Sequence, residues 1–231
     1  MCKKIVILLT LSCVCNVLAQ KHFNQQLKNE LDFILDTDQL LREYSIPSTS
    51  DSRKTEILNK TGYTTADVTK GIWNVINKQD SINLVKVERI IEKYGYPGKS
   101  MVGEPTNKAV WYVIQHSKKI SNYFDLIKTA GKQGEIPMTL VAMMEDRKLM
   151  YEGKEQIYGT QGAGRLIYDQ QGKEVFFNFI WPIANETHCN ERRKAVGFAN
   201  TIEEYAKDLE IPYVKFTMED FKKLRLVERR K

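Results

Sequence analysis

A tyrosine, a glutamine and a histidine lie close together between Trp111 and His116, and they offer groups for acid–base chemistry. If the segment is a helix, Tyr112 and His116 lie one turn apart on one face, and Trp111 and Gln115 are related in the same way. Because a histidine side chain titrates near neutral pH, His116 is a candidate general acid–base. A histidine satisfied by a backbone carbonyl in the core gives the same pattern, so the residues alone leave both interpretations open.

A second candidate segment combines charge with an apolar stripe. Leu140, Met143, Met144 and Arg147 recur at steps of three and four, so a helix would direct Arg147 toward the core side. A buried guanidinium needs a carboxylate or an anionic ligand, because an unpaired buried charge is costly. Asp146 lies beside Arg147 in the sequence. The pattern therefore predicts either a structural ion pair or an anion-binding site.

A third candidate segment, residues 156–164, carries two glutamines and a tyrosine and ends in glycines. In an extended chain the side chains of Gln156 and Tyr158 point to one face, because strand side chains alternate. The glycines after Gln161 permit close approach of the backbone to a ligand. The segment predicts either groups that orient a substrate or a polar edge strand with a flexible loop.

Several common catalytic and metal-binding motifs are absent from the sequence. It has no His-x-x-x-His, Cys-x-x-Cys or Gly-x-Ser-x-Gly motif. His188 and Cys189 are adjacent, which does not suit a catalytic Cys–His pair. Gly98-Lys99-Ser100 lacks the upstream glycine and the preceding strand of a phosphate-binding loop. We therefore expect no metal site and no cofactor.

In order and spacing, these segments resemble a bacterial protein family of unknown function. Its hallmarks are a Gln-His dipeptide, an Asp-Arg dipeptide and a Tyr-Gly-Thr-Gln motif, which here are Gln115-His116, Asp146-Arg147 and Tyr158 to Gln161. The resemblance covers roughly residues 80–210. It brings no established activity, but it implies that eight residues form one constellation: Gln115, His116, Asp146, Arg147, Gln156, Tyr158, Gln161 and Arg193.

From this constellation we expect an enzyme that performs hydrolysis or another acid–base step on a small polar or anionic substrate. The expected catalytic residues are His116 as general acid–base, Asp146 as the group that orients it or holds Arg147, and Tyr158. Five residues are expected to bind the substrate: Gln115, Arg147, Gln156, Gln161 and Arg193. The alternative is a non-catalytic binding or structural module in which the same residues form a buried polar network.

The N-terminus has the three-part layout of a secretory signal peptide. Lys3 and Lys4 precede an apolar run, and Ala19 supplies a small residue for cleavage before Gln20. The run of about 13 residues is shorter than the roughly 18–20 needed to span a bilayer. We therefore expect a protein exported to the periplasm or the cell exterior, with no stable membrane insertion after cleavage.

Cleavage would change the cysteine count and the charge of the chain. Cys189 would remain as the only cysteine, so no internal disulfide is expected. The formal net charge would fall from +6 to +4 with the loss of Lys3 and Lys4, too little and too scattered for nucleic-acid binding. The oligomeric state stays open.

The hydrophobic periodicity predicts a mainly α fold, α+β at most: a helical bundle-like domain with one small β-hairpin. Helices are expected at about 22–44, 53–78, 81–94, 105–117, 121–132, 137–153, 190–198 and 201–209. Extended runs are expected at 156–160, 165–168 and 175–181, with Phe176 to Trp181 packed as core. The chain divides into a signal peptide (1–19), an N-terminal helical region (20–79), a core domain that carries the motifs (80–216) and a basic C-terminal helix or tail (217–231).

Overall fold

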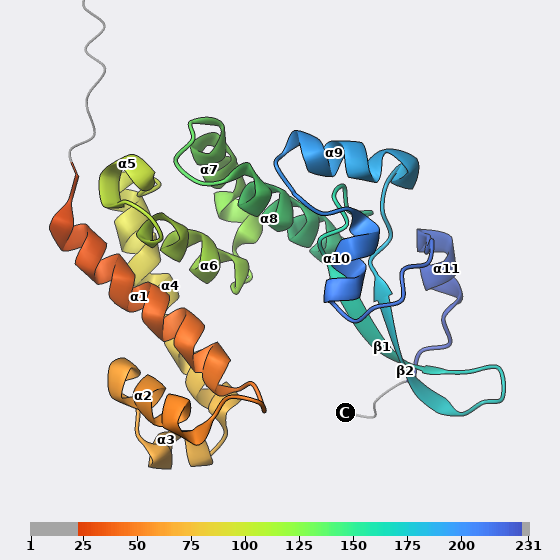
Figure 1. The fold of residues 1–231 in the computed structure, drawn as a ribbon, viewed down its shortest axis with the longest axis horizontal. Helices are drawn as coiled ribbons and strands as arrows, with labels where there is room; N and C mark the ends of the chain where they lie inside the picture. The colour runs from red at the N-terminus through yellow and green to blue at the C-terminus, as the bar shows by residue number, and fades with distance from the viewer. Residues whose placement is uncertain (1–22, 228–231) are drawn as a thin grey trace, which may run out of the picture.

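The computed structural model describes residues 23–227, and the fold is mainly α-helical with one two-stranded hairpin (Figure 1). The helices are α1 (Gln25–Tyr44), α2 (Asp51–Thr61), α3 (Thr65–Thr69), α4 (Ile72–Tyr94), α5 (Lys99–Val102), α6 (Ala109–Gln115), α7 (Ile120–Lys132), α8 (Met138–Tyr151), α9 (Cys189–Ala195), α10 (Ile202–Asp208) and α11 (Met218–Lys223). The strands are β1 (Gly162–Tyr168) and β2 (Glu174–Ile180). The predicted fold class is confirmed. The predicted signal peptide lies outside the described residues.

The helix α4 differs from the prediction, which broke the helix between residues 78 and 81. The chain stays helical from Ile72 to Tyr94, with Gly71 before it and Gly95 after it. The polar residues near residue 80 do not interrupt it, because the Ser81 hydroxyl bonds to the Asn77 carbonyl one turn back. α4 therefore runs across the expected boundary between the N-terminal region and the core domain.

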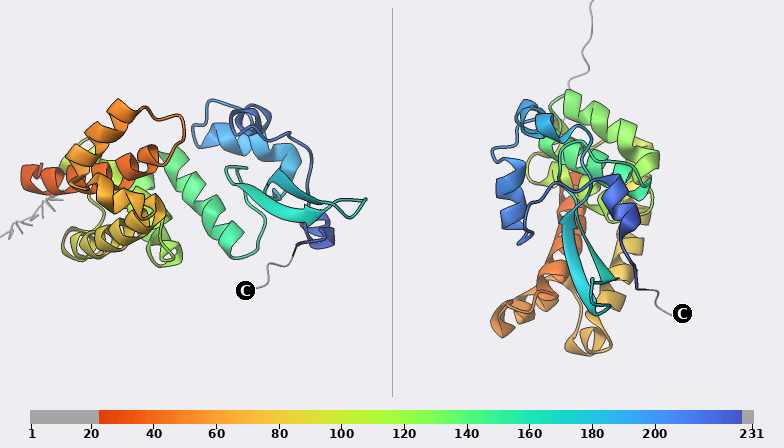
Figure 2. Two further views of the ribbon diagram at one scale, coloured as in Figure 1. Left: turned by 90° about the horizontal axis from the view of Figure 1, so that it is seen from below. Right: turned by 90° about the vertical axis from the view of Figure 1, so that its right-hand side faces the viewer.

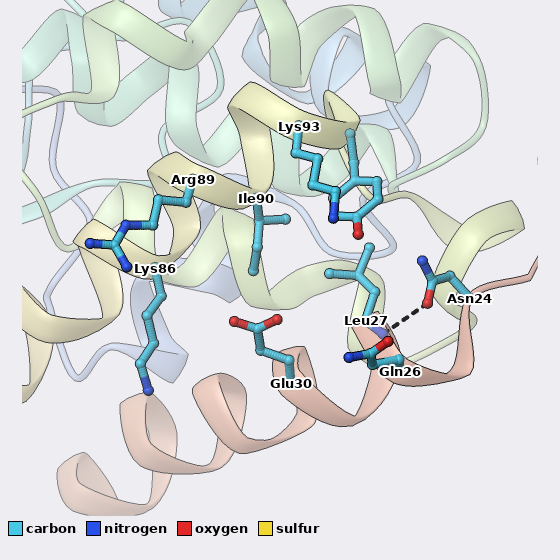
Figure 3. Close-up of a pocket in the computed structure, with 9 residues that line it drawn as sticks. Asn24, Gln26, Leu27, Glu30, Lys86, Arg89, Ile90 and Lys93 are labelled. Atoms are coloured by element: carbon cyan, nitrogen blue, oxygen red, sulfur yellow. Dashed lines mark hydrogen bonds between the residues drawn. The ribbon is translucent and has the colours of Figure 1, made fainter.

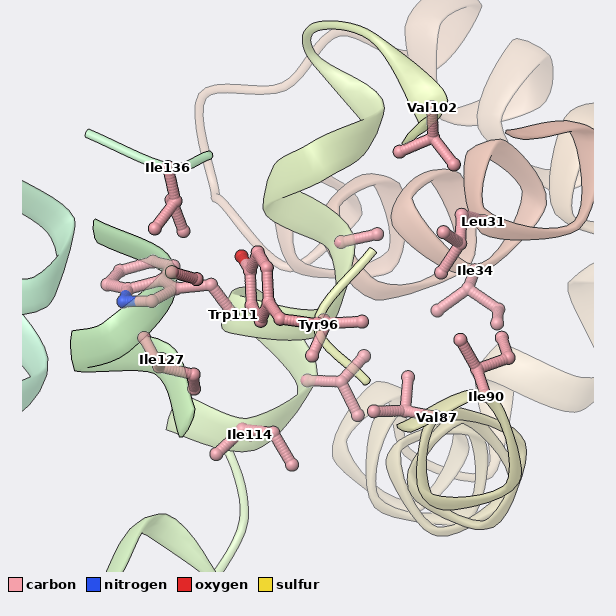
Figure 4. Packing of buried hydrophobic residues seen from close by; sticks show 14 of the residues in the cluster. Leu31, Ile34, Val87, Ile90, Tyr96, Val102, Trp111, Ile114, Ile127 and Ile136 are labelled. Atoms are coloured by element: carbon pink, nitrogen blue, oxygen red, sulfur yellow. The ribbon is translucent and has the colours of Figure 1, made fainter. Parts of the chain in front are cut away.

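The main core joins α1, α4, α6, α7 and α8 (Figure 4). Leu31 and Ile34 of α1 pack in the same buried cluster as Val87 of α4 and Ile114 of α6. Trp111 lies in this core and its indole N–H donates to the Leu140 carbonyl at 2.8 Å, which ties α6 to α8. These contacts fix the end of α6, where Gln115 and His116 lie, against α1 and α8.

The hairpin of β1 and β2 forms where the sequence pattern predicted two extended runs joined by a turn. Ala163 of β1 faces Phe179 of β2, and the Asp169 carboxylate accepts two backbone N–H groups in the turn. The prediction that residues 156–160 are extended is wrong, since only Gln156 forms a bridge, to Ile183. A loop runs there instead, and its backbone is held by side chains rather than by a neighbouring strand.

The aromatic strand is core over only part of its length. Phe179 and Trp181 are buried, as predicted, but Phe176 points away from the interior with 66% of its surface exposed. The buried pair packs against Phe216 and Phe221 from the segment around α11. The extended chain after α11 then runs along β1, where Leu226 bridges Ile167 in antiparallel fashion.

The elements fall into two groups with α7 and α8 between them (Figures 1 and 2). Helices α1 to α6 lie on one side, and the hairpin with α9 to α11 lies on the other. The loop from α8 to β1 therefore connects the helical part to the hairpin. Within residues 23–227, no helix is long and apolar enough to cross a membrane.

Candidate functional site

His116 follows the last residue of α6, and its ring lies against a buried carboxylate from α1. Its Nδ1 is 3.1 Å from Oδ1 of Asp38. Asp38 is 1% exposed, whereas the His116 side chain is 17% exposed. When Nδ1 carries the proton and donates to Asp38, Nε2 is left as the basic nitrogen, the arrangement that general-base histidines use.

Asp38 is itself held by its neighbours on α1. Gln39 Nε2 donates to Oδ2 at 2.6 Å, and Arg42 Nη1 lies 3.4 Å from Oδ1 and donates to the Asp38 carbonyl at 2.8 Å. The Arg42 guanidinium also forms a bidentate pair with Asp80 of α4 at 2.8 and 3.1 Å. The Gln39 amide and the nearby Arg42 charge together compensate the cost of burying the Asp38 carboxylate.

Asp38 is not among the site residues predicted from the sequence, although its position in α1 carries a signal. Asp38 stands four residues after Ile34 and three before Leu41, so it falls on the buried stripe of α1. A carboxylate on an apolar stripe needs a partner, the argument we applied to Arg147 alone.

A hollow of about 370 Å³ lies beside His116. Its polar lining includes Asp80, Ser81, Ser117, Lys118 and Lys119. Asp80 is paired with Arg42, and Lys119 is paired with Glu88 at 2.6 Å. Lys118 has no ion-pair partner among residues 23–227, so its ammonium group is available to an anionic or polar ligand.

Gln115, Arg147 and Gln161 continue the chain of polar contacts from His116. The Gln115 and His116 side chains meet at 3.4 Å, Nε2 to Nε2. The Gln115 carbonyl accepts from Arg147 Nη1 at 3.3 Å, and Arg147 Nε donates to Gln161 Oε1 at 3.0 Å. His116, Gln115, Arg147 and Gln161 thus form a continuous chain of polar contacts, each with the next.

Asp146, rather than Arg147, is the fully buried charge of α8. Arg147 is half-buried, and no carboxylate of the described chain pairs with it. Arg147 thus lies partly inside the protein, and the partners that it has there are neutral oxygens of Gln161 and Gln115. Asp146 is 0% exposed and lies one turn after the buried Ala142, on the same side of α8.

The Asp146 carboxylate shapes the loop that follows α8. Oδ1 accepts from the backbone N–H groups of Ile157 at 2.7 Å and Tyr158 at 3.0 Å, and Oδ2 accepts from the Thr160 N–H and hydroxyl, both at 2.9 Å. Burial raises the pKa of Asp146, and these hydrogen bonds oppose the rise. Within residues 23–227, Asp146 contacts neither His116 nor the Arg147 guanidinium, the two partners that we expected.

Gln156 and Arg193 are buried and hold the same loop from other sides. Gln156 Nε2 donates to the Gln161 and Trp181 carbonyls at 3.1 and 2.7 Å. Arg193 is 1% exposed and donates to the Tyr158 carbonyl at 2.9 Å and to both oxygens of Asn200. Desolvation lowers the pKa of Arg193. Every nitrogen of its guanidinium thus bonds inside the protein.

The Arg193 guanidinium also lies against two aromatic rings. Tyr158, whose carbonyl it binds, was expected to share a pocket with His116. The guanidinium carbon is 4.5 Å from the Phe198 ring centroid and 5.1 Å from that of Tyr205. Tyr158 is half-buried, and burial raises the pKa of its hydroxyl. In the described part of the chain, no hydrogen bond or ring contact links Tyr158 to His116.

The predicted residues therefore do not share one pocket. Some line two separate hollows, and Asp146, Gln156 and Arg193 are buried groups that hold the loop after α8. His116 lines the hollow described above, and Arg147 and Gln161 line another of about 400 Å³ at the start of β1. A further hollow of about 230 Å³ lies between α1 and α4 and contains none of the predicted residues (Figure 3). The described residues include no group of three His, Cys, Asp or Glu side chains able to hold a metal ion.

The family model described as Family of unknown function (DUF6624) matches residues 25–216. The chain belongs to this family. The matched region begins with α1, so Asp38 and Arg42 lie inside the family domain together with His116. Comparison with curated proteins and with solved structures gave no match.

Proposed function

We propose that this protein is an acid–base enzyme, hydrolase-like in its chemistry, that acts on a small polar or anionic substrate. The observation that supports it is the pair of His116 Nδ1 and Asp38 Oδ1 at 3.1 Å, at the edge of a hollow of about 370 Å³. A partly exposed imidazole backed by a buried carboxylate is the arrangement that proton transfer needs.

In this proposal His116 moves the proton and Asp38 positions it. Nε2 takes a proton from water or from the substrate, which displaces the long 3.4 Å contact of the Gln115 amide, while Nδ1–H keeps its hydrogen bond to Asp38. The negative charge of Asp38 stabilises the imidazolium until the proton passes to the leaving group. Lys118, at the same hollow, binds an anionic group of the substrate.

A turnover screen tests the proposal. The purified protein is incubated with a small-molecule extract, and consumed compounds are identified by mass spectrometry. We expect His116→Ala to lower the consumption of at least one compound by about 10²–10⁴-fold. The matched control is His188→Ala, because His188 is an exposed histidine paired with Glu191 on the surface. No consumption by the wild type, or equal consumption by the His116→Ala variant, would overturn the proposal.

A non-catalytic binding or structural module is the second candidate, and the loop after α8 favours it. Asp146, Gln156 and Arg193 are buried and their polar atoms bond inside the protein. This candidate predicts that His116→Ala lowers the free energy of unfolding by about 1–3 kcal/mol, since the buried Asp38 would lose one of its hydrogen-bond partners. The enzyme proposal predicts loss of turnover with a smaller change in stability.

We also propose that the protein is exported and cleaved near Ala19. The support is the basic start, the apolar run that follows and the small residue before Gln20. N-terminal sequencing of protein recovered outside the cytoplasm tests this, and the expected first residue is at or near Gln20. Recovery of a chain that still carries residues 1–19 contradicts it.

A further inference from the structure

One face of α4 combines cations with exposed apolar side chains. Lys86, Arg89 and Lys93 follow one another at steps of three and four, so they share one side of the helix. The same spacing places Ile82 and Val85 on that side, and they are 39% and 49% exposed. These five residues form a stripe that α4 presents to solvent, which we call the outer stripe.

The three cations of the outer stripe are not neutralised by ion pairs. No carboxylate of the described chain forms an ion pair with any of them. Glu30 of α1 lines the same hollow of about 230 Å³, but it is one carboxylate against three cations (Figure 3). Residues 1–22 contain no Asp or Glu, and Val227, the last described residue, pairs with Leu166 of β1, across α7 and α8 from α4 (Figure 1). The hollow therefore keeps a net positive charge.

Apolar side chains adjoin these cations directly. The Lys86 ammonium group lies over the Phe33 ring of α1, 5.4 Å from its centroid, and Phe33 is 47% exposed. Lys86 and Arg89 line the hollow of about 230 Å³ and also a shallow hollow that Ile82 and Val85 line. Adjoining exposed apolar groups mark an interaction site more often than single ones do. Positive charge and apolar surface thus form one continuous area.

A partner for this area must offer negative charge and apolar surface side by side. A small soluble anion offers only the charge. An anionic phospholipid bilayer offers both, because its phosphate headgroups lie next to acyl chains. Helices with basic groups beside exposed aromatic and aliphatic side chains lie at this boundary, and lysine and arginine add to their affinity.

We propose that the outer stripe of α4, together with Phe33, binds the surface of an anionic phospholipid bilayer. The three cations contact headgroup phosphates, and Phe33, Ile82 and Val85 enter the boundary between headgroups and acyl chains. The protein adsorbs to the surface, and α4 keeps its other side in the core. This binding does not depend on proton transfer at His116, which lines a different hollow.

Vesicle sedimentation tests the inference. The protein that begins at Gln20 is used, so that the N-terminal apolar run cannot itself bind lipid, and every described residue is retained. We expect it to bind vesicles of phosphatidylglycerol and phosphatidylcholine in equal parts. Binding to vesicles of phosphatidylcholine alone should be at least about tenfold weaker. Sodium chloride should weaken binding to the mixed vesicles, because salt screens exposed charges.

A triple variant removes the charge of the outer stripe. Lys86→Gln, Arg89→Gln and Lys93→Gln together should weaken binding to the mixed vesicles by about a hundredfold, since each cation near an anionic surface contributes about fivefold. Each variant is first checked for the circular dichroism spectrum of the wild type.

The matched control removes the same charge elsewhere. Lys173→Gln, Lys194→Gln and Lys207→Gln together change three exposed lysines of the hairpin, α9 and α10, across α7 and α8 from α4 (Figure 1). This variant should change binding by less than about threefold.

A second pair of variants tests the apolar contribution without changing the charge. Val85→Ser should weaken binding by about threefold to tenfold, because less apolar surface would leave water. Val214→Ser, at another exposed valine outside α4, should leave binding unchanged.

Four outcomes overturn the inference. The first is no binding to the mixed vesicles, and the second is an equal loss in the two triple variants. The third is stronger displacement by sodium phosphate than by sodium chloride of the same ionic strength, which would assign the hollow to a soluble anion. The fourth is self-association, seen by size-exclusion chromatography without lipid, that Val85→Ser abolishes, which would assign the outer stripe to a second copy of the chain.

Discussion

Gln156 and Gln161 bond to each other in both directions. Gln156 Nε2 donates to the Gln161 carbonyl at 3.1 Å, and the Gln161 N–H donates to Gln156 Oε1 at 2.9 Å. This reciprocal pair closes the loop after α8 and leaves the Gln161 side chain directed at Arg147. Gln156 does not line the hollow of about 400 Å³ that Arg147 and Gln161 line, but it holds Gln161 in place there. Its role is therefore structural rather than ligand binding.

Replacement of Gln156 by leucine should destabilise the protein. The Gln161 N–H and the Trp181 carbonyl would lose their partner in a site that is closed to water, and each such buried group costs about 1–3 kcal/mol. We expect the free energy of unfolding, measured by urea denaturation, to fall by about 2–4 kcal/mol. Gln170→Leu, in the exposed hairpin turn, is the control and should change it by less than about 0.5 kcal/mol. A Gln156→Leu protein of unchanged stability contradicts the scaffold role.

Replacement of Asp146 by asparagine should have a comparable effect. An asparagine amide offers one acceptor oxygen, whereas the carboxylate accepts from the N–H groups of Ile157 and Thr160 on different oxygens. We expect a loss of about 2–4 kcal/mol in the free energy of unfolding. The adjacent Glu145→Gln change is the control, because it removes only a partly exposed ion pair with Lys128. Equal stability of the two variants would show that the loop does not depend on Asp146.

Replacement of Asp38 by asparagine tests the catalytic pair. Loss of the negative charge removes the stabilisation of the His116 imidazolium, so we expect kcat on the substrate found in the turnover screen to fall at least about a hundredfold. A structural role alone would lower the free energy of unfolding and leave kcat of the folded protein unchanged.

The matched control for this change lies two residues away on the same helix. Asp36 forms a partly exposed ion pair with Lys60 at 3.1 Å and lies away from His116. Asp36→Asn should leave kcat unchanged. If it lowers kcat as much as Asp38→Asn does, the effect comes from α1 as a whole and the pair is not the cause.

Cys189 should react only after unfolding. The thiol is buried, and burial raises its pKa to about 11, so very little thiolate is present at pH 8. In a protein that begins at Gln20, Cys189 is the only cysteine. Iodoacetamide at pH 8 should leave the folded protein unmodified and add one group in denaturing urea, as read by intact mass. Rapid modification of the folded protein would show that α9 opens.

The sequence predicted elements whose signals are local. The apolar steps within α1 and α8 and the turn residues Asp169 to Gly172 depend on near neighbours, and helices and a hairpin formed there. The pair of Asp38 and His116 joins residues 78 positions apart, so only the packing of α6 on α1 brings it about. Residues 156–160 show the alternation of side chains that is typical of a strand. The sequence does not reveal that the Asp146 side chain, rather than a neighbouring strand, binds the backbone N–H groups there.

The placement of α1 has a consequence for how the protein can be divided. This helix supplies Leu31 and Ile34 to the main core and Asp38 to His116. A fragment that begins at residue 80 would retain the Gln-His, Asp-Arg and Tyr-Gly-Thr-Gln motifs, yet it would lose the carboxylate that accepts from His116 and part of the main core. The acid–base chemistry proposed for this protein thus requires two segments that lie far apart in the sequence, and a fragment that contains only one of them would lack it.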